Sequence, residues 1–290
     1  MVSAKCKSKR KFVYGMPVWY GDGSITAGVK RAAALGFDYV EISLDHPWPE
    51  SIRDSEVRSV LKIASSPKGI RFAFHAPLAG LGLAHPRPQL RNASVSVMKS
   101  CIDFACKFKP RLLYFNIHIS TETSVTLELG TVVEDILEAV IKSRDELTAY
   151  GRRKGVMVVF ENTQEAVFGM PSQVNLATGK GASFCFDIGH AAIMNAELEG
   201  AGLPAPDISD WIDVFKNRIK VCHLHDFNAK VGMDHLPPGE GGIDLRKALR
   251  LLRDKTKARY VLLEVFRHKT MKPASSSDLM KCLELVKKWA

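Results

Sequence analysis

The sequence predicts an α/β protein, a (β/α)8 barrel that forms one domain. Three observations predict this fold: eight short β-rich apolar runs, longer amphipathic segments between them, and a length of 290 residues, which suits one large core. An open doubly wound sheet is the main alternative. Because no GxGxxG follows the first run, a dinucleotide-binding fold has little support.

The expected strands and helices alternate along the chain. The eight runs are residues 12–16, 39–44, 71–75, 112–118, 156–161, 183–187, 220–223 and 260–266. Apolar residues at three- and four-residue spacing predict helices over residues 24–35, 90–108, 132–150, 245–254 and 277–289. Gly36, Gly69 and Gly155 each precede a run, where a glycine can end a helix in the left-handed conformation.

The two ends of the chain differ in composition. We expect residues 12–290 to form the barrel domain and residues 1–11 to form a basic N-terminal arm with five Lys and Arg residues. No apolar stretch completes a signal peptide, and no segment approaches the roughly 20 apolar residues that span a bilayer. We therefore expect no membrane partner.

Charge and cysteine content limit the partners and the compartment. The formal net charge of +10 favours anionic partners, such as nucleic acid or phosphorylated metabolites. Six cysteines show no CxxC spacing, which argues against a zinc knuckle or a thioredoxin-type motif and predicts a reducing, cytoplasmic location.

Acidic and histidine side chains follow the expected strands. Seven of the eight runs contain or end on such a residue, namely Glu41, His75, His118, Glu161, Asp187, His223 and Glu264. Two more lie just after strands: His190 comes three residues after Asp187, and His235 stands in the loop DHLPPGEGG. In a barrel of this kind the carboxyl ends of the strands form the active site, so these residues converge on one mouth.

A lone His or Glu at a strand end is usually a hydrogen-bonded rim residue, and for Glu41 this interpretation and a role in the site are equally open. His225 or Asp226 could orient a ligand. A mouth with so many carboxylates and imidazoles is costly unless a cation neutralises it. We therefore predict a divalent metal site, with the ligands His75, His118, Glu161, Asp187, His190, His223, His235 and Glu264. Imidazole with carboxylate favours Zn²⁺ or Mn²⁺.

In this order and context, these residues resemble the xylose-isomerase-like TIM-barrel superfamily, which includes sugar isomerases and epimerases and endonuclease IV-type AP endonucleases. The resemblance covers about residues 12–264. It is carried by HAP at His75, IHIS at His118, FENT at Glu161, CFDIGHA with Asp187 and His190, HLHD at His223, HLPPGEGGID at His235 and LLEVF at Glu264.

The nuclease branch holds three zinc ions, so the resemblance implies between one and three ions here. It places His75, His118 and Glu161 on one ion. Asp187, His223 and Glu264, with Glu161 shared, fall on the next. The third ion would take His190, His235 and an Asp two residues before His235. That position is Met233 here, with Asp234 displaced by one, so Asp234 is a possible ligand.

Other departures separate the chain from the nuclease branch. Leu78 follows HAP where the nuclease has an aromatic that contacts DNA, and FDIGHA lacks the Cys before the His. The loop HLPPGEGGID instead looks like that of the sugar phosphate isomerase/epimerase branch.

Two functions fit this set of residues. The first is isomerisation or epimerisation of a small sugar or sugar phosphate, through a metal-stabilised enediolate with Glu161 and Glu264 as acid and base. The alternative is phosphodiester hydrolysis at abasic DNA by a di- or trinuclear zinc cluster, with the basic arm binding the backbone. Of the two, the sequence favours the sugar enzyme.

Overall fold

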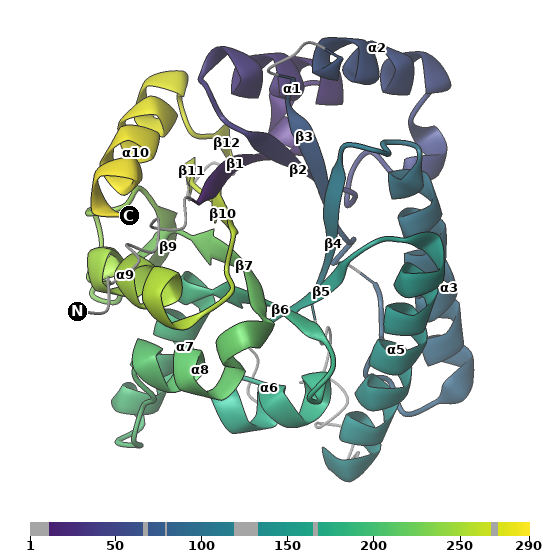
Figure 1. Ribbon diagram of the computed structural model, residues 1–290. Coiled ribbons are helices and arrows are strands. Elements are labelled where there is room, and N and C mark those ends of the chain that lie inside the picture. The colour runs from purple at the N-terminus through teal and green to yellow at the C-terminus, as the bar shows by residue number, and fades with distance from the viewer. Residues whose placement is uncertain (1–11, 66–68, 79, 119–132, 165–167, 268–271) are drawn as a thin grey trace, which may run out of the picture.

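The computed structural model describes the chain except for residues 1–11, 66–68, 79, 119–132, 165–167 and 268–271. The prediction of a basic arm at residues 1–11 lies outside the described residues. Eight parallel strands close into a barrel, in the order β1-β10-β7-β6-β5-β4-β3-β2 (Figure 1). The predicted (β/α)8 barrel is therefore confirmed.

The barrel strands lie close to the predicted runs. Their bounds are β1 (Val13–Val18), β2 (Tyr39–Ser43), β3 (Arg71–His75), β4 (Leu112–His118), β5 (Val158–Glu161), β6 (Ser183–Asp187), β7 (Ile219–Leu224) and β10 (Tyr260–Leu263). The last predicted run, 260–266, is longer than the strand, because Phe266 belongs to a separate short strand. The register pairs His118 with Glu161 and Asp187 with His223, so each of these pairs lies side by side on adjacent strands.

Helices surround the barrel (Figure 1). They are α1 (Ile25–Ala34), α2 (Asp54–Ala64), α3 (Pro88–Cys106), α5 (Val133–Lys154), α6 (Pro171–Thr178), α7 (Ile188–Gly200), α8 (Ile208–Phe215), α9 (Leu245–Lys255) and α10 (Ser276–Trp289), with short 3-10 helices η1 (Tyr20–Asp22), η2 (Pro49–Ser51) and η3 (Lys216–Arg218). Gly36 and Gly155 have φ of 77° and 62°, as predicted for glycines that end a helix.

Two antiparallel pairs extend beyond the barrel: β8 (Asp226–Asn228) with β9 (Met233–Leu236), and β11 (Phe266–Arg267) with β12 (Lys272–Pro273). Asp226 holds the loop after β9 through its carboxylate, which accepts backbone hydrogen bonds from Gly239 at 2.9 Å and Ile243 at 3.0 Å. A Cβ at Gly241 would meet the Asp226 Oδ1 at 2.3 Å, which explains a glycine in GEGG at this point. Asp226 therefore shapes the loop that follows His235.

The barrel interior contains two layers. Alternate residues of a strand point to the same face, so inward-facing side chains recur every second residue. The lower layer consists of Tyr39, Ala73, Tyr114, Val159, Cys185, Val221 and Leu262. Two residues further along the same seven strands come Glu41, His75, Asn116, Glu161, Asp187, His223 and Glu264, all of them buried. An apolar floor thus supports a polar layer at the carboxyl ends of the strands.

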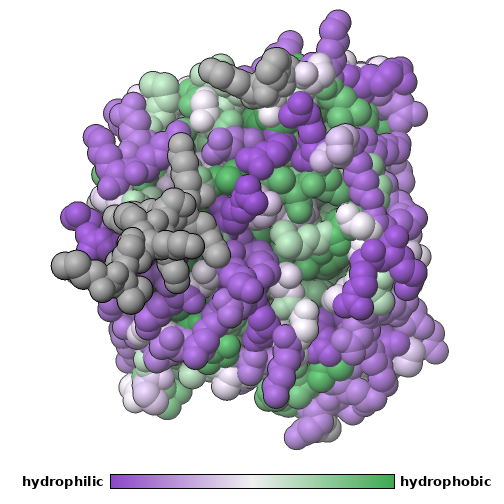
Figure 2. All heavy atoms as spheres, viewed as in Figure 1, coloured by the Kyte–Doolittle hydropathy of each residue, from purple (hydrophilic) through white to green (hydrophobic). Residues whose placement is uncertain are grey.

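The outward-facing strand residues pack against the helices in a separate and larger core. Figure 2 shows that hydrophilic side chains cover most of the face in view, with apolar residues visible between them. None of the helices in the described part of the chain combines the length and apolar character required to cross a membrane.

Candidate metal centre

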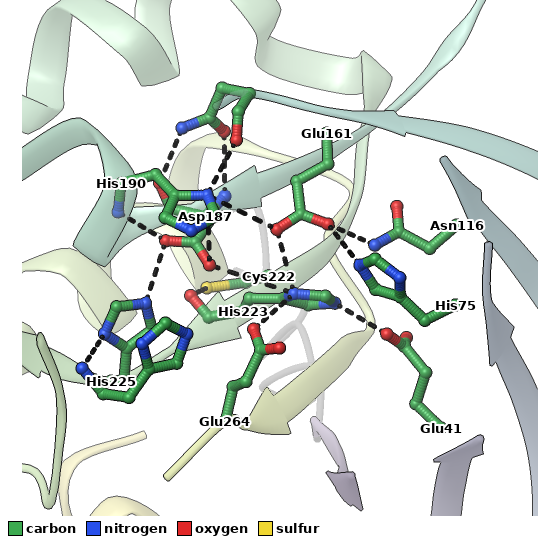
Figure 3. Close-up of polar contacts among 12 residues, drawn as sticks. Glu41, His75, Asn116, Glu161, Asp187, His190, Cys222, His223, His225 and Glu264 are labelled. Carbon is green, nitrogen blue, oxygen red and sulfur yellow. Dashed lines mark hydrogen bonds and ion pairs between the residues drawn. The ribbon is translucent and has the colours of Figure 1, made fainter. Parts of the chain in front are cut away.

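Four side chains from neighbouring strand ends form the centre, with the imidazole of His223 between three carboxylates. The His223 Nδ1 lies 2.8 Å from Glu264 Oε2, 3.1 Å from Glu161 Oε1 and 3.9 Å from Asp187 Oδ2. One potential ligand atom from each of the four lies within 4.8 Å of the others. Figure 3 shows these side chains pointing toward one another from β5, β6, β7 and the end of β10. The predicted ligands Glu161, Asp187, His223 and Glu264 therefore converge.

A second group lies on the β3 and β4 side of Glu161. The Nε2 atoms of His75 and His118 lie 3.6 Å and 3.4 Å from Glu161 Oε2. His75 Nδ1 lies 2.8 Å from the carbonyl oxygen of Ala76, so a proton on Nδ1 would donate to that oxygen and leave the Nε2 lone pair facing the site. Glu161 thus stands between two groups of potential ligands.

Three imidazoles form a third group. His190, His225 and His235 each offer a ring nitrogen within 4.8 Å of the others. The rings of His225 and His235 stack, with centroids 4.0 Å apart and an interplanar angle of 7°. Asp234, the predicted possible ligand, lies beside His235, with Oδ2 at 3.3 Å from His235 Nδ1. Sequence reasoning grouped Asp234 as a possible ligand with His190 and His235, and the structure brings His225 into the same group.

Local hydrogen bonds explain the motifs that hold these residues. Asp187 caps α7, and its Oδ1 accepts the backbone N–H of His190 at 2.6 Å, so the DIGH spacing brings Asp187 and His190 together. The Asn162 amide donates to the Asp187 carbonyl at 2.8 Å and its oxygen accepts the Asp187 N–H at 2.9 Å, which fixes the end of β5 against β6. Gly189 is required because a Cβ there would meet the His225 ring at 1.8 Å.

Several buried polar atoms of the centre have no hydrogen-bond partner among the described residues. They are Glu161 Oε1, Asp187 Oδ2, both ring nitrogens of His223, and His225 Nε2. Most buried polar atoms in folded proteins have partners, and an unsatisfied one costs about 1–3 kcal/mol. Glu161 Oε1, Asp187 Oδ2 and His223 Nδ1 face one another, so one cation could satisfy all three at once, whereas His223 Nε2 faces Glu41. The donor set, carboxylate with imidazole, fits Zn²⁺ or Mn²⁺.

The charges of the centre shift its pKa values strongly. Burial alone would raise the pKa of Glu161, but the neighbouring His223 and His118 outweigh it and hold that pKa well below its usual value. Burial likewise opposes ionisation of Glu264, yet His223 lowers the pKa of Glu264. Burial disfavours protonated His75, while its contact with Glu161 raises the pKa of His75 to about 9. The two glutamates are therefore ionised at neutral pH.

A cavity of about 250 Å³ opens over the centre. Its polar walls include His118, His190, Asp234 and Glu264. Its rim is apolar: the centroids of the Trp19 and Phe266 rings lie 4.9 Å apart, and Leu78 completes the lining. A cavity of this kind suits a small ligand that presents polar groups to the centre and an apolar face to the rim.

The family model for xylose isomerase-like TIM barrels matches residues 29–286, nearly the whole barrel. The chain belongs to this family. Its sequence resemblance to the xylose-isomerase-like superfamily is thereby confirmed. A comparison with curated proteins finds no match.

Solved structures of this family share the fold. A D-tagatose 3-epimerase-like protein is 18% identical, with a TM-score of 0.72 over 95% of this chain and 96% of that one. The TTHB071 protein from Thermus thermophilus, soaked with ZnCl2, is 21% identical, with a TM-score of 0.63 over 95% and 97%. Endonuclease IV from the same organism is 19% identical, with a TM-score of 0.59 over 95% and 98%. At these identities the likeness establishes the fold and leaves the reaction open.

Three residues of the centre stand outside the predicted ligand set. Asn116, which sequence reasoning missed, donates a hydrogen bond to Glu161 Oε2. Glu41, left open between rim and site, lies against His223 in the same layer, and His225, expected at most to orient a ligand, joins the imidazole group. For Asn116 and Glu41 the available signal was their position two residues after a buried residue of the lower layer. For His225 it was the HLHD motif, whose first and third residues both point inward.

Proposed function

We propose that the protein is a divalent-metal-dependent isomerase or epimerase of a small sugar or sugar phosphate. The observation that carries the proposal is the convergence of Glu161, Asp187, His223 and Glu264 beneath a small cavity with an apolar rim. A D-psicose 3-epimerase determined with D-fructose, 13% identical with a TM-score of 0.71, supports it as a neighbour in fold.

The four ligands provide the chemistry that such a reaction requires. A divalent ion held by them would act as a Lewis acid toward a carbonyl and its neighbouring hydroxyl, and would acidify the C–H between them. Glu161 and Glu264 come from strands that β6 and β7 separate in the barrel, so they reach the centre from different sides. Glu264 lines the cavity, whereas Glu161 is fully buried. One ionised glutamate would accept the proton from carbon. The other would return a proton to carbon after first taking one from the substrate hydroxyl or from solvent.

The most direct test follows that proton. The metal-loaded protein would be incubated with ketohexoses, aldoses and their phosphates in D₂O, and carbon-bound deuterium would be measured by NMR. We expect the unmodified chain to incorporate deuterium into at least one sugar and Glu161→Gln and Glu264→Gln to lose that activity. Glu138→Gln, an exposed glutamate paired with Lys142 on α5, is the matched control. Unchanged exchange in both glutamine variants would overturn the catalytic assignment.

A second candidate function is phosphodiester hydrolysis at abasic DNA. It is favoured by the two further ligand groups, His75 with His118 and Glu161, and the three imidazoles at His190, which exceed what a single ion requires. Incision of a duplex oligonucleotide with one abasic analogue tests it. Incision that is lost in Glu161→Gln, together with three bound ions per chain, would favour the hydrolase over the sugar enzyme.

A further inference from the structure

Glu41 lies beneath the metal centre, and neither proposed reaction requires it. It is inward-facing on β2, only 2% exposed, and its Oε1 lies 3.3 Å from His223 Nε2. Its Oε2 has no hydrogen-bond partner among the described residues. An ionised carboxylate at such a position is costly, and replacing a buried charge by an apolar residue of similar volume is often neutral or stabilising. Stability of the fold therefore gives no reason for a glutamate here.

The His223 ring has two different sides. Its Nδ1 faces the centre, 2.8 Å from Glu264 Oε2, while its Nε2 faces Glu41 (Figure 3). A neutral imidazole carries one proton and one lone pair, and the partner of one nitrogen decides which tautomer forms. To bind an ion through Nδ1, His223 must carry its proton on Nε2. Glu41 is the acceptor placed to hold it there.

The groups around Glu41 are neutral. The hydroxyls of Tyr114 and Tyr39 lie 3.2 Å apart in the lower layer, and burial raises the pKa of both well above the usual value. Burial also raises the pKa of the Cys185 thiol, which lies near His223. Glu41 is thus the group that presents a carboxylate oxygen to the lower side of His223, with its Oε1 at 3.3 Å from Nε2.

We infer that Glu41 is a positioning residue of the metal centre: it holds the Nε2 proton of His223, orients the ring and presents the Nδ1 lone pair to the ion. The inference rests on the proposed metal centre. Carboxylates that accept the second nitrogen of a metal-bound histidine recur in metalloproteins, and their loss weakens metal binding or activity by about 10–100-fold.

The test is a Co²⁺ titration of the full chain, followed by calorimetry and by visible absorption. We expect Glu41→Leu to weaken Co²⁺ binding at the centre by about 10–100-fold and to change the Co²⁺ spectrum. Glu41→Gln should lose less Co²⁺ affinity than Glu41→Leu, because the amide oxygen can still accept a hydrogen bond from the Nε2 proton of His223. Glu138→Leu makes the same change at an exposed glutamate on α5, so it is the matched control and should bind Co²⁺ as the unmodified chain does.

A structural role predicts a different pattern. If Glu41 only supported the fold, Glu41→Leu would lower the melting temperature of the metal-free protein; the inference expects it to stay unchanged or rise. In a Glu41→Leu variant that still folds, a lowered melting temperature, or Co²⁺ binding equal to that of the unmodified chain, overturns the inference while the metal centre stands. If the unmodified chain binds no Co²⁺, the metal centre fails and this inference fails with it.

A second measurement applies if Glu41→Leu does not fold. In the Zn²⁺-loaded protein, the ring proton on His223 Nε2 should give a downfield NMR signal that exchanges slowly with water. In Glu41→Gln that signal should move upfield and exchange faster, because a neutral acceptor replaces a charged one. A signal that does not change between the two proteins would contradict the role of Glu41.

Discussion

The two layers inside the barrel differ in chemistry although the same seven strands supply them. The lower layer is mostly aliphatic and aromatic, and where it is polar the groups pair, as the Tyr114 and Tyr39 hydroxyls do. The upper layer, two residues further along each strand, is acidic and imidazole-rich, and Glu161, Asp187 and His223 keep atoms there that have no hydrogen-bond partner among the described residues. Two residues along a strand thus separate the side chains that pack the barrel from those of the candidate metal centre.

This difference teaches where each kind of substitution should act. The lower layer stabilises the barrel by burial, whereas we expect the upper layer to be costly in the metal-free protein and to be stabilised by a bound ion. Barrels of this class generally place chemistry at the carboxyl ends of the strands and stability elsewhere. The division would fail if a lower-layer substitution changed ion binding without changing stability, or if an upper-layer substitution changed stability without changing ion binding.

The largest effect is expected for Glu161→Gln in the upper layer. Because Glu161 contacts both the His223 and the His75 groups, its loss should weaken ion binding by more than about 100-fold, beyond the effect typical of an outer-shell partner. Equilibrium dialysis with metal analysis measures this, and Glu138→Gln is the control. Ion content that stays at the wild-type level would show that Glu161 is not a ligand.

Leu262→Ala in the lower layer should act on stability alone. Leu262 is fully buried, and a Leu to Ala change in a core lowers the free energy of unfolding by about 2–5 kcal/mol. Urea denaturation of the metal-free protein measures the loss, while the number of ions bound by the folded chain should not change. A loss of ions without a loss of stability would contradict the division.

The pH dependence of the metal-free protein should come from the upper layer. The contact with Glu161 raises the pKa of His75 from 6.5 to about 9, so protonated His75 stabilises the fold fully below pH 6.5 and this contribution is lost as pH rises to about 9. The loss is at most about 1.4 kcal/mol per pH unit for each such group. Denaturation in EDTA across this range should show the decline. Saturating Zn²⁺ should reduce this decline in stability, because an ion takes the place of the proton. A free energy of unfolding in EDTA that does not change with pH would be inconsistent with a contribution from His75.

The smallest effect is expected outside both layers. Ser275 caps α10 by accepting the backbone N–H of Asp278 at 3.1 Å. Ser275→Ala should lower the free energy of unfolding by about 1 kcal/mol and leave ion binding and pH dependence as they are. A change in ion affinity in this variant would mean that affinity follows global stability rather than the upper layer.

The barrel could be predicted because two patterns are strong in the sequence: the recurring β-rich apolar runs, and the three- and four-residue spacing of apolar residues between them. The β-rich runs end on residues such as His75, Glu161 and Asp187, and parallel strands bring such ends to one rim. The helices with a clear apolar face, such as α9 (Leu245–Lys255), were predicted within a residue or two. Convergence of the four candidate ligands at the centre therefore followed from strand order alone.

What remained unpredicted depends on contacts between strands. The helix α7 (Ile188–Gly200) is apolar on most sides, so it lacks the pattern that marks a helix on a sheet. The stacking of His225 on His235 depends on how β8 pairs with β9. The periodicity of apolar residues in the sequence does not determine the register of that pair. Whether Glu41 lay at the rim or under the ligands depended on its neighbour across the barrel, His223, which only the closed structure reveals.

The location of a bound ion tests the central claim most directly. A crystal of the full chain grown with Zn²⁺ or Mn²⁺, measured with X-rays near the absorption edge of that metal, would locate the ion by its anomalous signal. We expect a peak among the side chains of Glu161, Asp187, His223 and Glu264. A metal-saturated crystal with no peak there, or with ions only at surface sites, would contradict the claim.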